Sequence, residues 1–346
     1  MSDETVTLQH GNGMVPDGSR GYDLDDNARA LMATNLAAEV CPAAGESRSL
    51  IYASSLQHAW NDEQGRFDNF VHTDHGWVET VGSEDSNGRA FWALGHTAEM
   101  SRSGYLRWWA QHWLDKVLPS FHDLSSPRAV AFNVLGACCV LRKRPDHVGA
   151  IRLVGDGASM VSYLLDDCRR PDWAWFEAVL GYDNPRLSHA LIEAGELRGV
   201  SEWLEAGLET LKWICGQQTT RTGQFRPVGS DTLGRSGQIR PFAQQSFEAQ
   251  AAVEATEAAY RVTGAREWLD HARAAHAWFF GADDLRVALV DSTSGRFQNG
   301  NTAHPRHDDC GAQSRRAYQL ATYSLRRMHK VAERRHWAVG DVASSN

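Results

Sequence analysis

A short pattern recurs along this chain and constrains its fold more than any other feature. Most copies begin with Asn or Ser, carry Arg two positions later and end on Ala. The copies are NARA (27–30), NGRA (87–90), SPRA (126–129) and NPRL (184–187), with weaker relatives SFEA (246–249) and SRRA (314–317). Asn and Ser are favoured at helix starts, and proline is tolerated in the first turn. Six related helix starts in 346 residues predict a repeated helical architecture.

The segments that follow the pattern differ from those between its copies. Residues 89–95 (RAFWALG) and 128–136 (RAVAFNVLG) are small and apolar, whereas 104–118 (GYLRWWAQHWLDKVL) is amphipathic. A helix that is apolar on most faces belongs in an interior, and an amphipathic helix belongs at a surface. This alternation predicts an all-α (α/α)6 toroid, a single domain over 1–346 whose six inner helices run parallel; an open α-solenoid is the alternative. Helices are predicted over 27–40, 48–60, 87–100, 104–119, 127–142, 147–167, 185–198, 201–215, 246–262, 266–279 and 313–333.

Long loops precede several of the predicted inner helices. A Gly-x-Phe element recurs in them at 65–67, 223–225 and 295–297. Short β-strands at these elements would form a rim around the end of the ring where the inner helices begin, which we call the mouth. At the chain ends we expect a flexible, glycine-rich arm over 1–20 and a disordered tail over 335–346.

The charge and the cysteines argue against several classes of protein. With 35 basic and 43 acidic residues the formal net charge is −8, which disfavours nucleic acid or an anionic membrane as partner. No apolar stretch reaches the roughly 20 residues of a membrane span, and the first residues lack the apolar core of a secretory signal. The six cysteines form no Cys-x-x-Cys pair. Buried thiols in a reducing cytoplasm are therefore expected rather than disulfides or a zinc site.

Acidic residues gather close to the predicted starts of inner helices. Because parallel inner helices begin at one end of the ring, acids from hairpins far apart in sequence would meet at the mouth. Two carboxyl groups across a cleft can cleave a glycosidic bond, since one protonates the leaving oxygen and the other activates water. The alternative is that they stabilise helix starts through the macrodipole, by about 0.3–1 kcal/mol each. The candidate catalytic residues are Asp25 and Asp26, paired with Glu177 or Asp183, and then Glu84 and Asp85.

Residues 170–187 (RPDWAWFEAVLGYDNPRL) place aromatic side chains beside two of these acids. Trp173 and Trp175 would offer flat apolar faces to a sugar ring, unless they pack as a cluster between helices. The arginines of the repeat would hold the carboxylates and bias which of them keeps its proton. The residues predicted to bind substrate are Tyr22, Asp23, Arg29, Trp77, Arg89, Trp92, Trp173, Trp175, Tyr182, Asn184, Arg186, Gln245, Glu248, His304 and His307.

Three segments resemble metal sites only in part. Residues 23–27 (DLDDN) match the opening of a calcium-binding loop, but Ala28 stands where that loop needs Gly and Thr34 where it needs Glu. The segments HTDH (72–75) and HPRHDD (304–309) are rich in His, yet contact with sugar hydroxyls or a solvated loop is the favoured interpretation. We therefore predict no metal and no cofactor.

Several of these motifs together resemble a bacterial family of (α/α)6 six-hairpin glycosidase-like proteins, often fused to or neighbouring glycosyltransferases. The resemblance covers nearly the whole chain. It implies the toroid fold and a carbohydrate ligand, and it does not assign an acid and a base. The segments that carry it are VPDGSRGYDLDDNARAL (15–31), GSEDSNGRAFWALG (82–95), WAWFEAVLGYDNPRLSHALI (173–192), 245–281 and GAQSRRAYQLATYSL (311–325).

Four functions are compatible with these features. The favoured one is an inverting glycoside hydrolase for a short oligosaccharide, whose catalytic carboxyls would lie about 6.5–9.5 Å apart. A carbohydrate-binding or scaffold module that accompanies a glycosyltransferase would need the aromatic residues but not the acids. A class II terpene cyclase is suggested only by the D-x-D-D match at 23–26. A sugar epimerase or isomerase would instead move protons through the candidate histidines His72, His75, His304 and His307.

Overall fold

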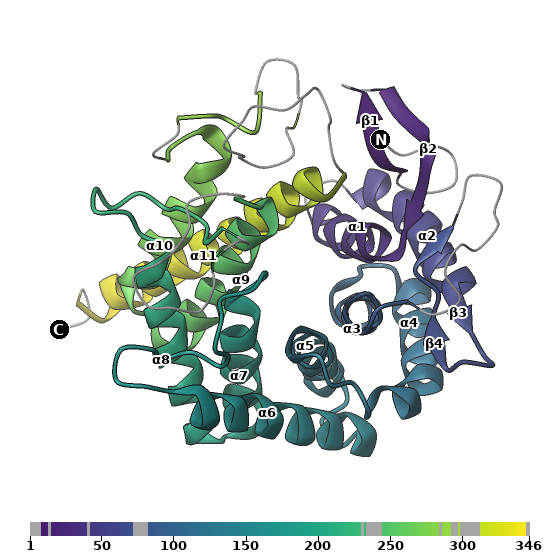
Figure 1. Ribbon diagram of the computed structural model, residues 1–346, viewed down its shortest axis with the longest axis horizontal. Coiled ribbons are helices and arrows are strands. Elements are labelled where there is room, and N and C mark those ends of the chain that lie inside the picture. Colours follow the sequence, from purple (N-terminus) through teal and green to yellow (C-terminus); the bar gives the residue numbers. More distant parts are fainter. Residues whose placement is uncertain are drawn as a thin grey trace.

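The computed structural model describes residues 8–12, 15–39, 42–71, 82–229, 232, 244–283, 286–291, 297 and 312–343, and the structural statements below concern these residues. Their helices form two concentric layers (Figure 1). The inner helices are α1 (Leu24–Ala37), α3 (Glu84–Met100), α5 (Pro127–Lys143), α7 (Pro185–Arg198), α9 (Ser246–Thr263) and α11 (Ala312–Ala343). The outer helices are α2 (Pro42–Ala59), α4 (Gly104–Val117), α6 (Val148–Cys168), α8 (Ser201–Gln217) and α10 (Arg266–Ala277).

The inner helices close into a ring. Each contacts the next inner helix along the chain, and α11 returns to contact α1 (Figure 1). An open solenoid would leave α1 and α11 apart, so that alternative is wrong. The order of helices and the closed ring confirm the predicted (α/α)6 toroid.

Close packing between α3 and α5 depends on glycine. A Cβ atom on Gly95 would lie 2.3 Å from the carbonyl oxygen of Gly136, and one on Gly136 would lie 2.9 Å from the Cα atom of Trp92. The two backbones therefore meet without side chains between them. This accounts for the small residues that the sequence places in the inner helices.

The repeat pattern does not begin at the same position in every inner helix, since Ser246 is the first residue of α9 and Ser314 the third residue of α11. Ser126 and Asn184 occupy the N-cap position, as predicted, but neither side chain makes a capping hydrogen bond. Asn27 and Asn87 are not, because α1 is capped by Asp23 and α3 by Ser83, four positions earlier. The prediction that these two asparagines cap their helices is wrong, because an acid or a serine upstream satisfies the free amides first.

Asn87 has another structural role inside its helix. Its amide group binds both the N–H and the C=O of Phe67, at 2.7 and 3.1 Å. It thereby fastens the strand β4 (Arg66–Phe67) to α3. An inner-helix asparagine thus holds part of the rim.

Short strands lie around the mouth, as predicted. The strands β1 (Leu8–Asn12), β2 (Val15–Asp23) and β5 (Phe70–Val71) form an antiparallel sheet in the order β1-β2-β5, and β3 (Trp60–Asn61) pairs with β4. The Gly-x-Phe elements supply β4 and two isolated bridges, Thr219 to Phe225 and Val290 to Phe297. Their three phenylalanines, Phe67, Phe225 and Phe297, are buried.

The chain ends differ from the expectation. Much of the predicted flexible arm forms the strands β1 and β2, and α11 continues to Ala343, well into the predicted disordered tail. The tail sequence AERRHWAVGDVA (332–343) has no proline and consists mostly of residues compatible with a helix, so nothing in it stops α11.

One outer helix also differs from the expectation that no segment could span a membrane. By length and composition alone, α6 is apolar enough to do so. Its apolar residues have another explanation, because Leu153, Val154, Ala158 and Val161 are buried on the side that packs on α5 and α7. Two short 3-10 helices, Leu118–Phe121 and Trp278–Phe280, complete the described elements.

Candidate active site

The third position of the repeat pattern forms a ring of buried charge near the mouth. No member of this set is more than 8% exposed. Several reach helices that are not their neighbours in the ring: Arg29 on α1 donates to Gln250 on α9 at 2.9 Å, and Arg89 on α3 binds Asp183 before α7 at 3.0 Å. These side chains therefore extend towards the axis. The set consists of Arg29, Arg89, Arg128, Arg186, Glu248 and Arg316.

A chain of ion pairs crosses the axis just inside the mouth. Arg89 binds both Asp25 and Asp183, and Arg186 binds Asp183 at 3.2 Å and Glu254 at 2.5 Å. Asp183 is fully buried and has a φ of 49°, in the left-handed region. A buried charge is stable only when it is paired, and here guanidinium groups pair each carboxylate. Arg89 and Arg186 therefore pair the acids Asp25, Asp183 and Glu254.

The aspartates 23, 25 and 26 lie together at the start of α1. Asp23 caps the helix by accepting from the amide of Asp26 at 3.2 Å. Asp25 is 26% exposed and forms ion pairs with Arg89 and, at 4.0 Å, with Arg29. Since α1 starts at Leu24, residues 24–34 are helix and not a calcium-binding loop. Among the described residues, no three His, Cys, Asp or Glu side chains are grouped as metal ligands would be.

The surroundings of Asp23 and Asp26 favour the protonated carboxyl. Burial, followed by the negative charge of Asp25, raises the pKa of Asp23 to about 6. Burial, followed by the charges of Asp23 and Asp25, raises the pKa of Asp26 well above its usual value. Asp23 is only half-buried, whereas Asp26 is 5% exposed. Of these two carboxyl groups with raised pKa values, Asp23 is therefore the more accessible to a substrate.

Glu248 is a second buried acid near the mouth, on α9. It accepts from the backbone N–H and the side-chain amide of Asn184, at 3.0 and 3.1 Å, and from Gln218 at 2.9 Å. Burial and the charge of Asp183 raise its pKa to about 8. Asn184 therefore joins α7 to α9 through this carboxyl. The neighbouring candidate Gln245 is the N-cap residue of α9.

The other candidate acids contact structural groups. Glu84 accepts from the backbone N–H groups of Ser125 and Ser126 at 2.7 and 2.6 Å, ahead of α5. Burial alone would raise the pKa of Glu84, but these hydrogen bonds outweigh it and lower the pKa. Asp85 accepts from the Ser126 hydroxyl at 2.6 Å, and burial raises its pKa. Their hydrogen bonds position α5 relative to α3.

Glu177 lies in the loop before α7 and is held by Arg128. The two side chains form an ion pair, and Arg128 also donates to the carbonyl of Tyr182 at 2.8 Å. The ring of Tyr182 lies 5.3 Å from that guanidinium and is 38% exposed. Tyr182 is thus an aromatic residue near the mouth that solvent reaches, as a substrate-binding residue must be.

Trp173 and Trp175 do not form an exposed platform. They are 1% and 0% exposed, and their rings lie 5.1 and 5.8 Å from the ring of Trp213 on α8. The predicted sugar-stacking role is wrong, because these indoles fill the space between the loop and α8. The packed cluster considered as the alternative is what the structure contains.

The remaining substrate-binding candidates divide into two groups. Tyr22 and Trp92 are 9% and 6% exposed, and the ring of Trp92 stacks on Phe132 at 5.9 Å, with Arg186 over it at 4.9 Å. The rest lie outside the described residues: Trp77, His304 and His307, together with the proton-shuttle candidates His72 and His75.

The structure adds residues that the sequence did not single out. Gln250 and Glu254 bind repeat arginines, and both follow the weakest copy of the pattern, one and two turns further along α9. A scan of each inner helix for polar residues beyond its first turn could have found Gln250 and Glu254.

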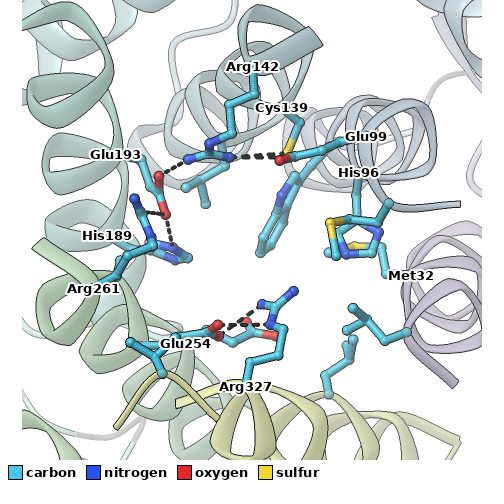
Figure 2. Close-up of a pocket in the computed structure, with 18 of the residues that line it drawn as sticks. Met32, His96, Glu99, Cys139, Arg142, His189, Glu193, Glu254, Arg261 and Arg327 are labelled. Atoms are coloured by element: carbon cyan, nitrogen blue, oxygen red, sulfur yellow. Dashed lines mark hydrogen bonds and ion pairs between the residues drawn. The ribbon is translucent and has the colours of Figure 1, made fainter. Parts of the chain in front are cut away.

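Further along the ring axis than these ion pairs, a cavity of about 540 Å³ lies among the later turns of the inner helices (Figure 2).

Comparison with known proteins identifies the fold. No family model and no curated protein matches the sequence. The structure is similar to cellobiose 2-epimerases from Bacillus thermoamylovorans (TM-score 0.71, 11% identity, 95% of this chain and 94% of that one) and Spirochaeta thermophila (0.70, 15%, 95% and 92%). It is also similar to an α-mannanase of glycoside hydrolase family 76 from Bacteroides thetaiotaomicron (0.59, 10%, 91% and 88%). The chain therefore has the (α/α)6 toroid fold that these sugar-acting enzymes share.

Proposed function

We propose that this protein is an enzyme that performs acid–base catalysis on a sugar at the mouth, and that its reaction is hydrolysis of a short oligosaccharide. The observation that carries the proposal is the difference between Asp23 and Asp25. Asp23 has a pKa raised to about 6, whereas Asp25 takes part in ion pairs with Arg89 and Arg29. A carboxyl group with a raised pKa near an ion-paired carboxyl group suits the acid and base roles of a glycosidase.

In this proposal each aspartate has one task. Asp23 in its protonated form donates its proton to the oxygen of the glycosidic bond as that bond breaks. Asp25 accepts a proton from the water that attacks the anomeric carbon, and Arg89 holds its carboxylate in place. Asp183 and Glu254 act indirectly, since they position Arg89 and Arg186. Water attack in a single step inverts the anomeric centre, and proton NMR of the first product would show it.

A comparison of variants tests the assignment. A panel of gluco- and manno-disaccharides would be incubated with the wild type and with Asp23→Asn, Asp25→Asn and Asp166→Asn. Asp166 is an exposed acid on the outer helix α6 and serves as the matched control. We expect kcat to fall by about 100-fold or more in the first two variants and to stay unchanged in the third. Full activity in Asp23→Asn and Asp25→Asn would overturn the assignment.

Epimerisation or isomerisation of a sugar is the second candidate. Its support is that the cellobiose 2-epimerases match this chain with higher TM-scores than the α-mannanase, 0.71 and 0.70 against 0.59. Such a reaction removes and returns a proton at a sugar carbon, so in heavy water the product would carry deuterium at C2. Hydrolysis releases monosaccharides without carbon-bound deuterium. Mass spectrometry of the products therefore separates the two reactions.

A further inference from the structure

The cavity of about 540 Å³ lies at the end of the ring opposite the mouth. Its wall comes from the later turns of all six inner helices, through Met32, His96, Arg142, Glu193, Glu254 and Arg327. Arg89 near the mouth and Glu99 at the cavity are ten residues apart on α3, which corresponds to about 15 Å along a helix. Arg186 stands between the two ends, because it binds Asp183 on one side and Glu254 on the other. The cavity is therefore separate from the aspartates of the proposed active site.

One side of the cavity is lined by fixed charges. Figure 2 shows Arg142, Glu193, Arg261 and Glu254 around one side, with Met32 and His96 facing them. Arg261 binds Glu193 at 2.8 Å, and Arg142 binds Glu193 as well. These groups are held by one another and present several hydrogen-bonding atoms in fixed positions.

The same arrangement continues along the wall. Arg142 also binds Glu99 at 3.3 Å, and Arg327 binds Glu257 at 2.8 and 2.9 Å. Each glutamate in the lining thus has an arginine partner, including Glu254, which binds Arg186. The acids of the cavity are consequently neutralised.

Two cations in the lining have no acidic partner. Lys330 and Arg334 lie one turn apart on α11, are exposed, and form no ion pair with any residue that the structure describes. Because they are exposed while Met32 and His96 are buried, they mark the opening of the cavity. The opening is therefore positively charged, in a protein whose formal net charge is −8.

His96 gives a second indication of a ligand. It is 7% exposed, it lines the cavity, and its Nδ1 atom has no hydrogen-bond partner among the described residues. Burial and the nearby charges of Arg327 and Arg142 lower its pKa to about 3, so the ring is neutral. A neutral imidazole beside Met32 forms the apolar side of the cavity and retains one free polar atom. Ligand pockets commonly have volumes of about 300–1,000 Å³ and combine an apolar wall with a few placed polar groups.

We propose that this cavity is a second ligand site, and that it binds a phosphorylated monosaccharide. The phosphate lies between Lys330 and Arg334 at the opening, since phosphate oxygens bind cationic donors strongly. The sugar hydroxyls bind the arginine and glutamate groups of the wall, and the less polar face of the ring lies against Met32 and His96. This site is independent of the proposed reaction at the mouth.

Calorimetric titration of the full chain tests the proposal. Glucose 6-phosphate, mannose 6-phosphate, glucose and inorganic phosphate would each be titrated into the wild type and into the double variant Lys330→Ala/Arg334→Ala. We expect one of the two sugar phosphates to bind with 1:1 stoichiometry, at least ten-fold more tightly than glucose or phosphate. In the double variant we expect its affinity to fall at least ten-fold, and to fall with added salt in the wild type.

Two controls make the result decisive. Arg326→Ala removes an exposed cation from the same helix that does not line the cavity, and Asp25→Asn alters the mouth; both should bind the sugar phosphate as the wild type does. Lys330 and Arg334 are exposed, so the double variant should fold, and its thermal unfolding curve would verify this. No binding of either sugar phosphate, unchanged binding by the double variant, or equal binding of inorganic phosphate alone would each overturn the proposal.

Discussion

The two ends of the ring use the same six inner helices for different electrostatic purposes. At the mouth, Asp25 pairs with Arg29 and Arg89, and burial raises the pKa values of its neighbours Asp23 and Asp26. At the opposite end, every glutamate in the cavity has an arginine partner, and two cations remain. A cluster with protons to exchange is equipped for chemistry, whereas a cluster of satisfied ion pairs is equipped for binding. Both ends contain arginines and acids, and they differ in how completely the arginines pair the acids.

The largest expected effect comes from removing the residue that joins the two ends. Arg186→Met would remove the arginine that Glu254 binds and one of the two arginines that Asp183 binds, all in a buried region. We expect the free energy of unfolding to fall by about 3–5 kcal/mol, measured by urea denaturation. The control Arg152→Met breaks an exposed pair with Asp156 and should cost less than about 1 kcal/mol. Equal losses in both variants would show that the ion pairs of Arg186 do not hold the ring together.

The next prediction separates the two ends functionally. Asp25→Asn should lower kcat for the oligosaccharide by about 100-fold or more while leaving the affinity for a sugar phosphate unchanged. The double variant Lys330→Ala/Arg334→Ala should lower the affinity for the sugar phosphate while leaving kcat for the oligosaccharide unchanged. Parallel assays of activity and binding on both proteins would measure this. If each variant impaired both the activity and the binding of the sugar phosphate, the two ends would form one site.

A smaller effect is expected from pH. Because Asp23 must carry a proton to act as the acid, kcat/KM should decrease as the pH rises through about 6, approaching a ten-fold decrease for each further pH unit. The sign follows from burial, which favours the neutral carboxyl. Initial rates between pH 5 and 8 would show this limb. A rate that increases across that range would indicate that Asp23 acts in its charged form.

The smallest expected effect distinguishes structural acids from catalytic ones at the mouth. Glu84→Gln weakens hydrogen bonds to the amides of Ser125 and Ser126, so the free energy of unfolding should fall by about 1 kcal/mol. Because the pKa of Glu84 is lowered in the folded state, its contribution is present at neutral pH and is lost as the pH falls through the carboxylate range. Activity should stay at the wild-type level. A large loss of kcat would return Glu84 to the catalytic candidates.

The fold could be predicted from the sequence because helix packing leaves a periodic record. The repeat pattern, the small residues after it and the amphipathic segments between copies gave the order and number of helices, and the Gly-x-Phe elements gave the rim strands. The predicted N-cap roles of Asn27 and Asn87 were wrong, because the pattern does not reveal which of two possible capping residues the helix uses.

The candidate site was harder to predict, because a sequence does not show what lies beyond a segment. Trp173 and Trp175 look like a sugar platform until α8 brings Trp213 against them. Asp183 looks like a catalytic acid, yet it is fully buried between Arg89 and Arg186. Both depend on contacts between residues far apart in the chain, and local composition carries no record of those contacts.

The proposed function depends most on the raised pKa of Asp23 beside Asp25, and carbon NMR of protein labelled at the aspartate carboxyl tests it most directly. The signal of Asp23 is identified by its loss in Asp23→Asn and followed from pH 3 to pH 9. We predict that it titrates near pH 6 in the wild type, and at a lower pH in Asp25→Asn, because the neighbouring negative charge is gone. Titration near pH 4 that Asp25→Asn does not change would contradict the account.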